Sequence, residues 1–137
     1  MRRALALLAV ACAACTDVNT CQTGPATVGD ACIPRTIAPN LPVKIELREL
    51  CGNECDSLPG CTAILRNGEV VLEVEQEVCT ASSGTCNAGC QQRAFPCTLP
   101  PLTPGDWPLA VPGGPPRLLH VQAEGAASCL FPDAGVQ

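Results

Sequence analysis

The chain has 137 residues, of which twelve are cysteine, and its formal net charge is −5 at pH 7. The few lysines and arginines are scattered and do not interleave with aromatic residues, which argues against binding to nucleic acid. Phe95, Trp107 and Phe131 are the only aromatic residues, so the core must be built from smaller aliphatic side chains that each bury less area.

The first residues have the pattern of an export signal. Arg2 and Arg3 precede the apolar run 4–11, and small residues follow it. This run is too short to span a bilayer, which needs about 20 residues, and no later segment is long and apolar enough. We therefore predict a signal peptide over residues 1–14.

The end of this signal, Ala9-Val10-Ala11-Cys12-Ala13-Ala14-Cys15, resembles the lipobox of bacterial lipoproteins. In that family the cysteine becomes the first residue of the mature chain and carries a diacylglycerol thioether, usually with an N-acyl group. Two or three acyl chains anchor a protein stably. The resemblance therefore implies a palmitate-type lipid anchor in the bacterial cell envelope, on a periplasmic or surface face.

Two cysteines compete for the lipid. If Cys15 is lipidated, Cys12 leaves with the signal and the ten remaining cysteines can all pair. If Cys12 is lipidated, an odd cysteine remains, which an oxidising compartment disfavours. Parity therefore favours Cys15. A further alternative is a secreted protein without lipid, because Ala9-Val10-Ala11 is also a cleavage site for ordinary signal peptidase.

The cysteines beyond Cys15 predict a disulfide scaffold, as is typical of small exported domains. They are Cys21, Cys32, Cys51, Cys55, Cys61, Cys79, Cys86, Cys90, Cys97 and Cys129. Each disulfide contributes about 2–4 kcal/mol. Ten cysteines allow roughly 900 pairings, so the sequence leaves the connectivity open, although a Cys21–Cys32 bridge is one expectation.

Two cysteine clusters have similar spacing. One holds Cys51, Cys55 and Cys61, the other Cys86, Cys90 and Cys97. An internal repeat and coincidence both stay open as explanations. Neither cluster has the two-residue spacing of a redox motif or of a haem-attachment motif. Zinc would compete with disulfide formation in an exported protein. We therefore predict structural disulfides, without a metal or a cofactor.

Residues 15–40 are rich in Thr, Pro, Gly, Asn and Asp and are predicted to form the lipidated N-terminus and a tether. One disulfide-stapled β domain is expected over residues 41–137. Residues 41–50 alternate, with Val43, Ile45 and Leu47 on one face, as in a half-buried strand.

Residues 62–79 predict a hairpin with a type I′ turn at Asn67-Gly68. Its return strand places Val70, Leu72, Val74 and Val78 on one face and Glu73, Glu75 and Glu77 on the other. A second hairpin is expected over 107–124, with Trp107, Leu109, Val111, Leu119, Val121 and Ala123 facing inward. Its prolines, among them Pro108, suggest an edge strand.

These elements together predict an all-β fold, a small disulfide-rich antiparallel β-sandwich with long Pro/Gly-rich loops. Residues 99–111, LPPLTPGDWPLAV, resemble the entry into a late hairpin of immunoglobulin-like bacterial surface domains. The resemblance implies an immunoglobulin-like sandwich and no particular ligand.

No catalytic residue is predicted. His120 is the only histidine, it alternates out of phase with its apolar neighbours, and no G-x-S-x-G element is present. The glutamates of the return strand could gather calcium or a basic partner, but a solvated strand face explains them better. Trp107 is expected to pack in the core; as an exposed residue it could anchor a partner.

The expected function is that of a membrane-anchored envelope lipoprotein acting as a non-enzymatic structural module or a module that binds a protein or envelope ligand. The alternative is a secreted disulfide-rich inhibitor or effector that presents a rigid loop, such as 51–61 or 112–116, to a target protein. A hydrolase is disfavoured because basic and nucleophilic partners are lacking.

Overall fold

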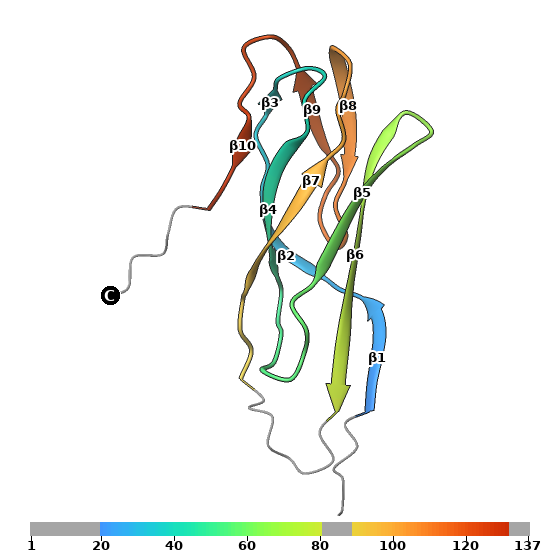
Figure 1. The fold of residues 1–137 in the computed structure, drawn as a ribbon, viewed down its shortest axis with the longest axis vertical. Helices are drawn as coiled ribbons and strands as arrows, with labels where there is room; N and C mark the ends of the chain where they lie inside the picture. Colours follow the sequence, from blue (N-terminus) through green and yellow to red (C-terminus); the bar gives the residue numbers. More distant parts are fainter. Residues whose placement is uncertain (1–19, 81–88, 132–137) are drawn as a thin grey trace, which may run out of the picture.

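The computed structural model describes residues 20–80 and 89–131, which form an all-β fold of two sheets (Figure 1). The strands are β1 (Thr20–Pro25), β2 (Val28–Cys32), β3 (Thr36–Ile37), β4 (Val43–Glu49), β5 (Gly60–Arg66), β6 (Glu69–Thr80), β7 (Ala94–Leu99), β8 (Gly105–Ala110), β9 (Arg117–Val121) and β10 (Ser128–Cys129). The prediction of a small disulfide-rich β-sandwich is confirmed. Its longer strand pairs are antiparallel, and its parallel pairs are short.

The first sheet is organised around the long strand β6. Its first half pairs with β5 from Arg66↔Glu69 to Gly60↔Glu75, and its second half pairs with β1 as far as Thr20↔Thr80. The two residues between β5 and β6, Asn67 and Gly68, have φ values of 53° and 79°. This is the left-handed conformation that a type I′ turn requires, so the predicted hairpin is confirmed. Strands β8, β9 and β3 complete the sheet.

The second sheet is built on β4. Strand β7 occupies one edge of β4, while β2 and β10 share the other. The alternation predicted for β4 is confirmed, because Val43, Ile45 and Leu47 are fully buried. They face a core to which β6, β8 and β9 of the first sheet contribute Val70, Leu72, Val74, Leu109, Leu119 and Val121.

Two positions predicted to face inward are exposed instead. Val78 is 48% exposed, because the second half of β6 pairs with the exposed strand β1 and lies beyond the aliphatic core. Ala123 is exposed because β9 ends at Val121.

The predicted tether over residues 15–40 contains three strands, β1, β2 and β3. They pair with β6, β4 and β9, which are all distant in sequence. The folded part of the chain therefore begins at least as early as Thr20 and not at residue 41.

Pro108 does not mark an edge strand, because β8 lies between β6 and β9. Strand β8 pairs with β6 only at Leu109 and Ala110, after the proline. At Pro108 itself, β8 has a strand partner on one side only, namely Leu118 of β9, so a missing N–H can be tolerated there.

Four disulfides join described cysteines: Cys21–Cys79, Cys32–Cys129, Cys51–Cys90 and Cys61–Cys97. The expected Cys21–Cys32 bridge is therefore wrong, since β1 and β2 belong to different sheets and each cysteine reaches a closer strand. The two similar cysteine clusters are linked to each other, and Cys61–Cys97 joins the two sheets through β5 and β7.

Some predictions fall outside the described residues: the signal peptide at 1–14, lipidation at Cys15 or Cys12, and the pairing of Cys86. Within the described ranges, no helix has the length and apolar character needed to cross a membrane.

Candidate functional site

The loop 50–59, between β4 and β5, is held on a buried polar cluster. Glu49 ends β4 at a position whose phase continues Val43, Ile45 and Leu47, and it is only 1% exposed. Gln76 occupies the matching inward position of β6 and is also buried. Its side-chain amide donates to the Glu49 carboxylate at 3.0 Å and to the Ser57 carbonyl at 3.0 Å.

Arg93, just before β7, completes this cluster. Its guanidinium forms a two-pronged ion pair with Glu49, through Nε to Oε1 and through Nη2 to Oε2. It also donates to the backbone carbonyls of Asp56 and Ser57. A buried carboxylate is tolerated only when it is paired and hydrogen-bonded, and here every buried side-chain polar atom of the described residues has a partner.

The electrostatics of the pair follow from this geometry. The hydrogen bond to Glu49 raises the pKa of the Arg93 guanidinium above its ordinary value, against the opposing effect of burial. A cation with a raised folded pKa contributes its full stabilisation below its unfolded pKa and loses it only above that value. The arginine side of the pair is therefore charged across the whole ordinary pH range.

The loop is ordered from within as well. The Asn53 side chain accepts hydrogen bonds from the backbone N–H groups of Cys55 and Asp56, which is an Asx turn. The Asp56 carboxylate accepts from the N–H groups of Asn53 and of Cys79 on β6. Ser57 pairs with Glu77 through both backbone and hydroxyl.

Two covalent links add to this hold on the loop. Cys51 is bonded to Cys90, and Cys55 is also disulfide-bonded. Gly52 is required because a Cβ there would collide with the Glu49 carboxylate. The result is a rigid loop whose outer side exposes Glu54 and the half-exposed Leu58.

Sequence reasoning missed Glu49, Gln76 and Arg93. The signal for the first two is phase, because a polar side chain stands where a two-residue period requires a core residue. Arg93 carries no comparable signal, since it lies outside a strand and meets Glu49 across a separation of 44 residues.

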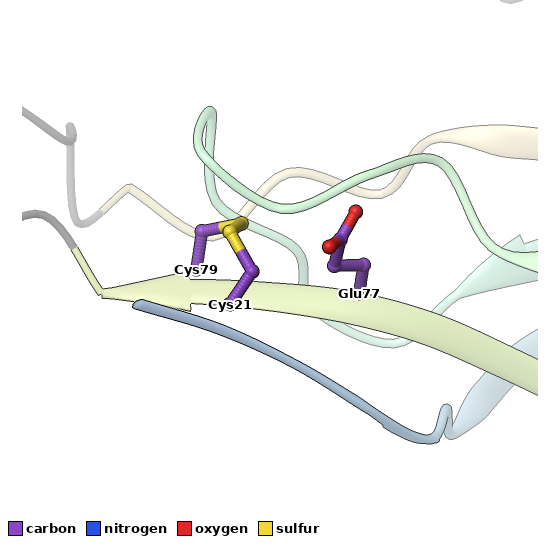
Figure 2. Close-up of side chains that lie close together, drawn as sticks. All are labelled: Cys21, Glu77 and Cys79. Carbon is purple, nitrogen blue, oxygen red and sulfur yellow. A yellow bond between two sulfur atoms is a disulfide. The ribbon is translucent and has the colours of Figure 1, made fainter. Parts of the chain in front are cut away.

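Figure 2 shows Glu77 beside the disulfide of Cys21 and Cys79. The two sulfur atoms and a Glu77 carboxylate oxygen lie within 4.8 Å of one another. Metals bind cysteine as the thiolate, and both sulfurs are bonded to each other. This group therefore offers one carboxylate and does not make a metal site.

His120 lies on the outer face of the first sheet, where its Nδ1 is 2.7 Å from the Asp106 carboxylate. Both side chains are about half exposed or more. The imidazole contacts the Asp106 carboxylate, while the backbone N–H of His120 donates to the Arg35 carbonyl; among the described residues no hydroxyl or thiol hydrogen-bonds to the ring. The pair thus lacks the third group that an Asp-His arrangement activates in catalysis.

Hollows in the described surface are open and mixed in character. One of about 510 Å³ is lined by Gly24, Pro25 and Pro112 together with Glu73 and Glu75 of β6. Glu73 forms an exposed ion pair with Arg66. Trp107 packs against the core and donates from its indole to the Thr103 carbonyl. Glu73 and Trp107 therefore add no reactive group to these hollows.

Comparison with known proteins finds no family model, no curated protein and no solved structure that matches this chain. The functional assignment therefore depends on the residues themselves. The disulfides indicate an oxidising compartment, extracellular or in the cell envelope.

Proposed function

We propose that the chain is a lipid-anchored envelope protein whose disulfide-stapled β domain is a non-enzymatic binding or structural module. The lipobox-like residues 9–15 and the even number of cysteines beyond Cys15 support the anchor. The domain supplies rigid loops on a cross-linked scaffold.

The proposal rests on one observation, that several interactions fix the conformation of the loop 50–59. The ion pair of Glu49 with Arg93, the Asx turn at Asn53 and the Cys51–Cys90 disulfide all fix the loop backbone. A preformed loop loses little conformational freedom on binding, and preorganisation of this kind raises affinity. The half-exposed Leu50 and Leu58 provide apolar contacts on a loop whose other exposed side chains are mostly polar.

The same loop suits a second function, that of a secreted inhibitor or effector that inserts Leu58 into a target protein. The two proposals differ in the N-terminus, since an inhibitor of this kind needs no lipid. The fold is common to both.

The intact mass of the mature protein from its native host, measured with and without reduction and thiol labelling, tests the anchor. We expect a chain that begins at Cys15, carries a diacylglyceryl group and has no free thiol. A mature chain without added lipid would contradict the anchored module and favour the secreted inhibitor. A lipidated chain that begins at Cys12 would keep the anchor and leave an odd cysteine.

A further inference from the structure

We infer that the domain stands end-on at the membrane, with the loop 50–59 against the lipid headgroups and the β5–β6 turn pointing away. This orientation rests on the proposed lipid anchor. It assigns a specific partner, the bilayer surface, to the loop whose rigidity is described above.

The distance between the lipid and the domain is short. From Cys15 to Thr20 there are five Cα–Cα steps, which span about 18 Å when fully extended. Lipidation at Cys12 would raise the number to eight steps and the maximum reach to about 28 Å. Thr20 therefore stays close to the headgroups in either case.

The domain is longer than this reach. Thr20 pairs with Thr80 at the end of β6, while the turn at Asn67-Gly68 precedes its start. Figure 1 shows β1 and the end of β6 on the same side as the loop between β4 and β5, with the β5–β6 turn at the far side. Glu69 to Thr80 at 3.3 Å per residue spans about 36 Å. The domain therefore cannot invert to bring the turn to the membrane with the loop 50–59 outermost.

Surface chemistry selects the end-on arrangement over one that lies flat. Leu58 and Val78 are about half exposed and lie near Thr20, since Ser57 bonds to Glu77 and Val78 pairs with Gln22. The outer face of the first sheet carries the half-exposed Leu118 together with the carboxylates of Glu73 and Glu75, and desolvating these carboxylates against lipid is unfavourable. Glu54 and Glu77 are exposed at this end as well, so the contact is with headgroups and does not reach the acyl core.

Tryptophan fluorescence in vesicles tests the orientation. The lipidated protein is reconstituted in phosphatidylcholine vesicles that contain a phosphatidylcholine with a nitroxide on its headgroup. Two matched variants carry Trp107→Phe together with either Leu58→Trp or Leu65→Trp. Leu58 and Leu65 are both 50% exposed, so neither change disturbs the core, and they lie at opposite ends of the β5 segment. Intact mass confirms the lipid on each variant.

We expect quenching several-fold stronger for the Leu58→Trp variant than for the Leu65→Trp variant, and little quenching of Trp107 in the unchanged protein. Equal quenching of the two variants, or the reverse order, would overturn the orientation and leave the anchor in place. A mass without lipid would overturn the anchor and the orientation together.

A second measurement needs no substitution. Carbodiimide labelling of exposed carboxylates, followed by peptide mass spectrometry, compares the lipidated protein in vesicles and in detergent. Glu54 and Glu124 are both exposed, one on the loop 50–59 and the other beyond the end of β9. We expect vesicles to protect Glu54 and leave Glu124 unchanged. Protection of Glu124, or of neither residue, would contradict the end-on arrangement.

Discussion

Glu49 and Arg93 form the pair on which the loop 50–59 depends. Arg93→Ala would leave a carboxylate that is 1% exposed without its cation. Breaking a buried pair in this way costs about 3 kcal/mol, the low end of the usual range, because the Arg93 side chain is itself 26% exposed. Urea denaturation of the oxidised protein measures this loss.

Arg66→Ala is the matched control for that measurement. Arg66 pairs with Glu73 on the surface, where the two side chains are 59% and 47% exposed, so its loss should cost well under about 1 kcal/mol. Equal losses for the two variants would show that the buried cluster does not hold the loop.

Gly52 is constrained by the same carboxylate. Gly52→Ala would place a methyl group against the Glu49 carboxyl, which Arg93 and Gln76 hold from the other sides. Displacing it should lower stability by about 1–3 kcal/mol. Gly24→Ala is the control, because no atom lies within 4 Å of the added methyl group. If the Gly52→Ala variant has an unchanged melting temperature, the Glu49 carboxylate must be able to move freely.

Among the elements, those with a strong local signal could be predicted from the sequence. Strand β4 alternates through Val43, Ile45 and Leu47, and the β5–β6 hairpin has Asn67-Gly68 at its turn. Strands β1 to β3 could not, because they are short, their residues are mostly small or polar apart from Val28 and Ile37, and their pairing depends on distant strands.

The disulfide connectivity could not be predicted from the local sequence either. Cys61 and Cys97 meet because β5 and β7 lie at adjoining edges of the two sheets, which no spacing reveals. The polar cluster is an intermediate case. Phase marks Glu49 and Gln76 as unusual inward residues, whereas the partner Arg93 follows only from the tertiary fold.

The Cys61–Cys97 disulfide should matter more for global stability than Cys21–Cys79. The former joins the two sheets next to the core, and Cys97 is 2% exposed. The latter joins β1 and β6, which are already hydrogen-bonded partners at an exposed margin. Replacing Cys61 and Cys97 by alanine should therefore cost about 2–4 kcal/mol.

The corresponding double alanine variant at Cys21 and Cys79 serves as the comparison. We expect it to cost less and to loosen β1 locally, as hydrogen exchange would detect. Chain-entropy reasoning alone predicts the opposite order, since the sequence separations are 36 residues for the first pair and 58 for the second. The order of the two losses thus decides whether position in the fold or loop length dominates.

The core of the molecule contains few large side chains, and the fold is held by many disulfides. Phe95 is the only aromatic residue among the described buried side chains, and apart from the polar pair Glu49 and Gln76 the rest are aliphatic or small. All nine described cysteines are disulfide-bonded. A core of this kind buries less area per residue than one with large rings, so the disulfides supply much of the margin over the unfolded state.

Complete reduction should therefore unfold the domain without any denaturant. Several disulfides at about 2–4 kcal/mol each match or exceed the whole stability of about 5–15 kcal/mol that domains usually have. Trp107 reports the change, because its indole packs on the core and donates to the Thr103 carbonyl; its emission should shift to the red as thiols appear. Alkylated, reduced protein that still unfolds in one cooperative urea transition would contradict this account, because its aliphatic core would then suffice to hold both sheets together.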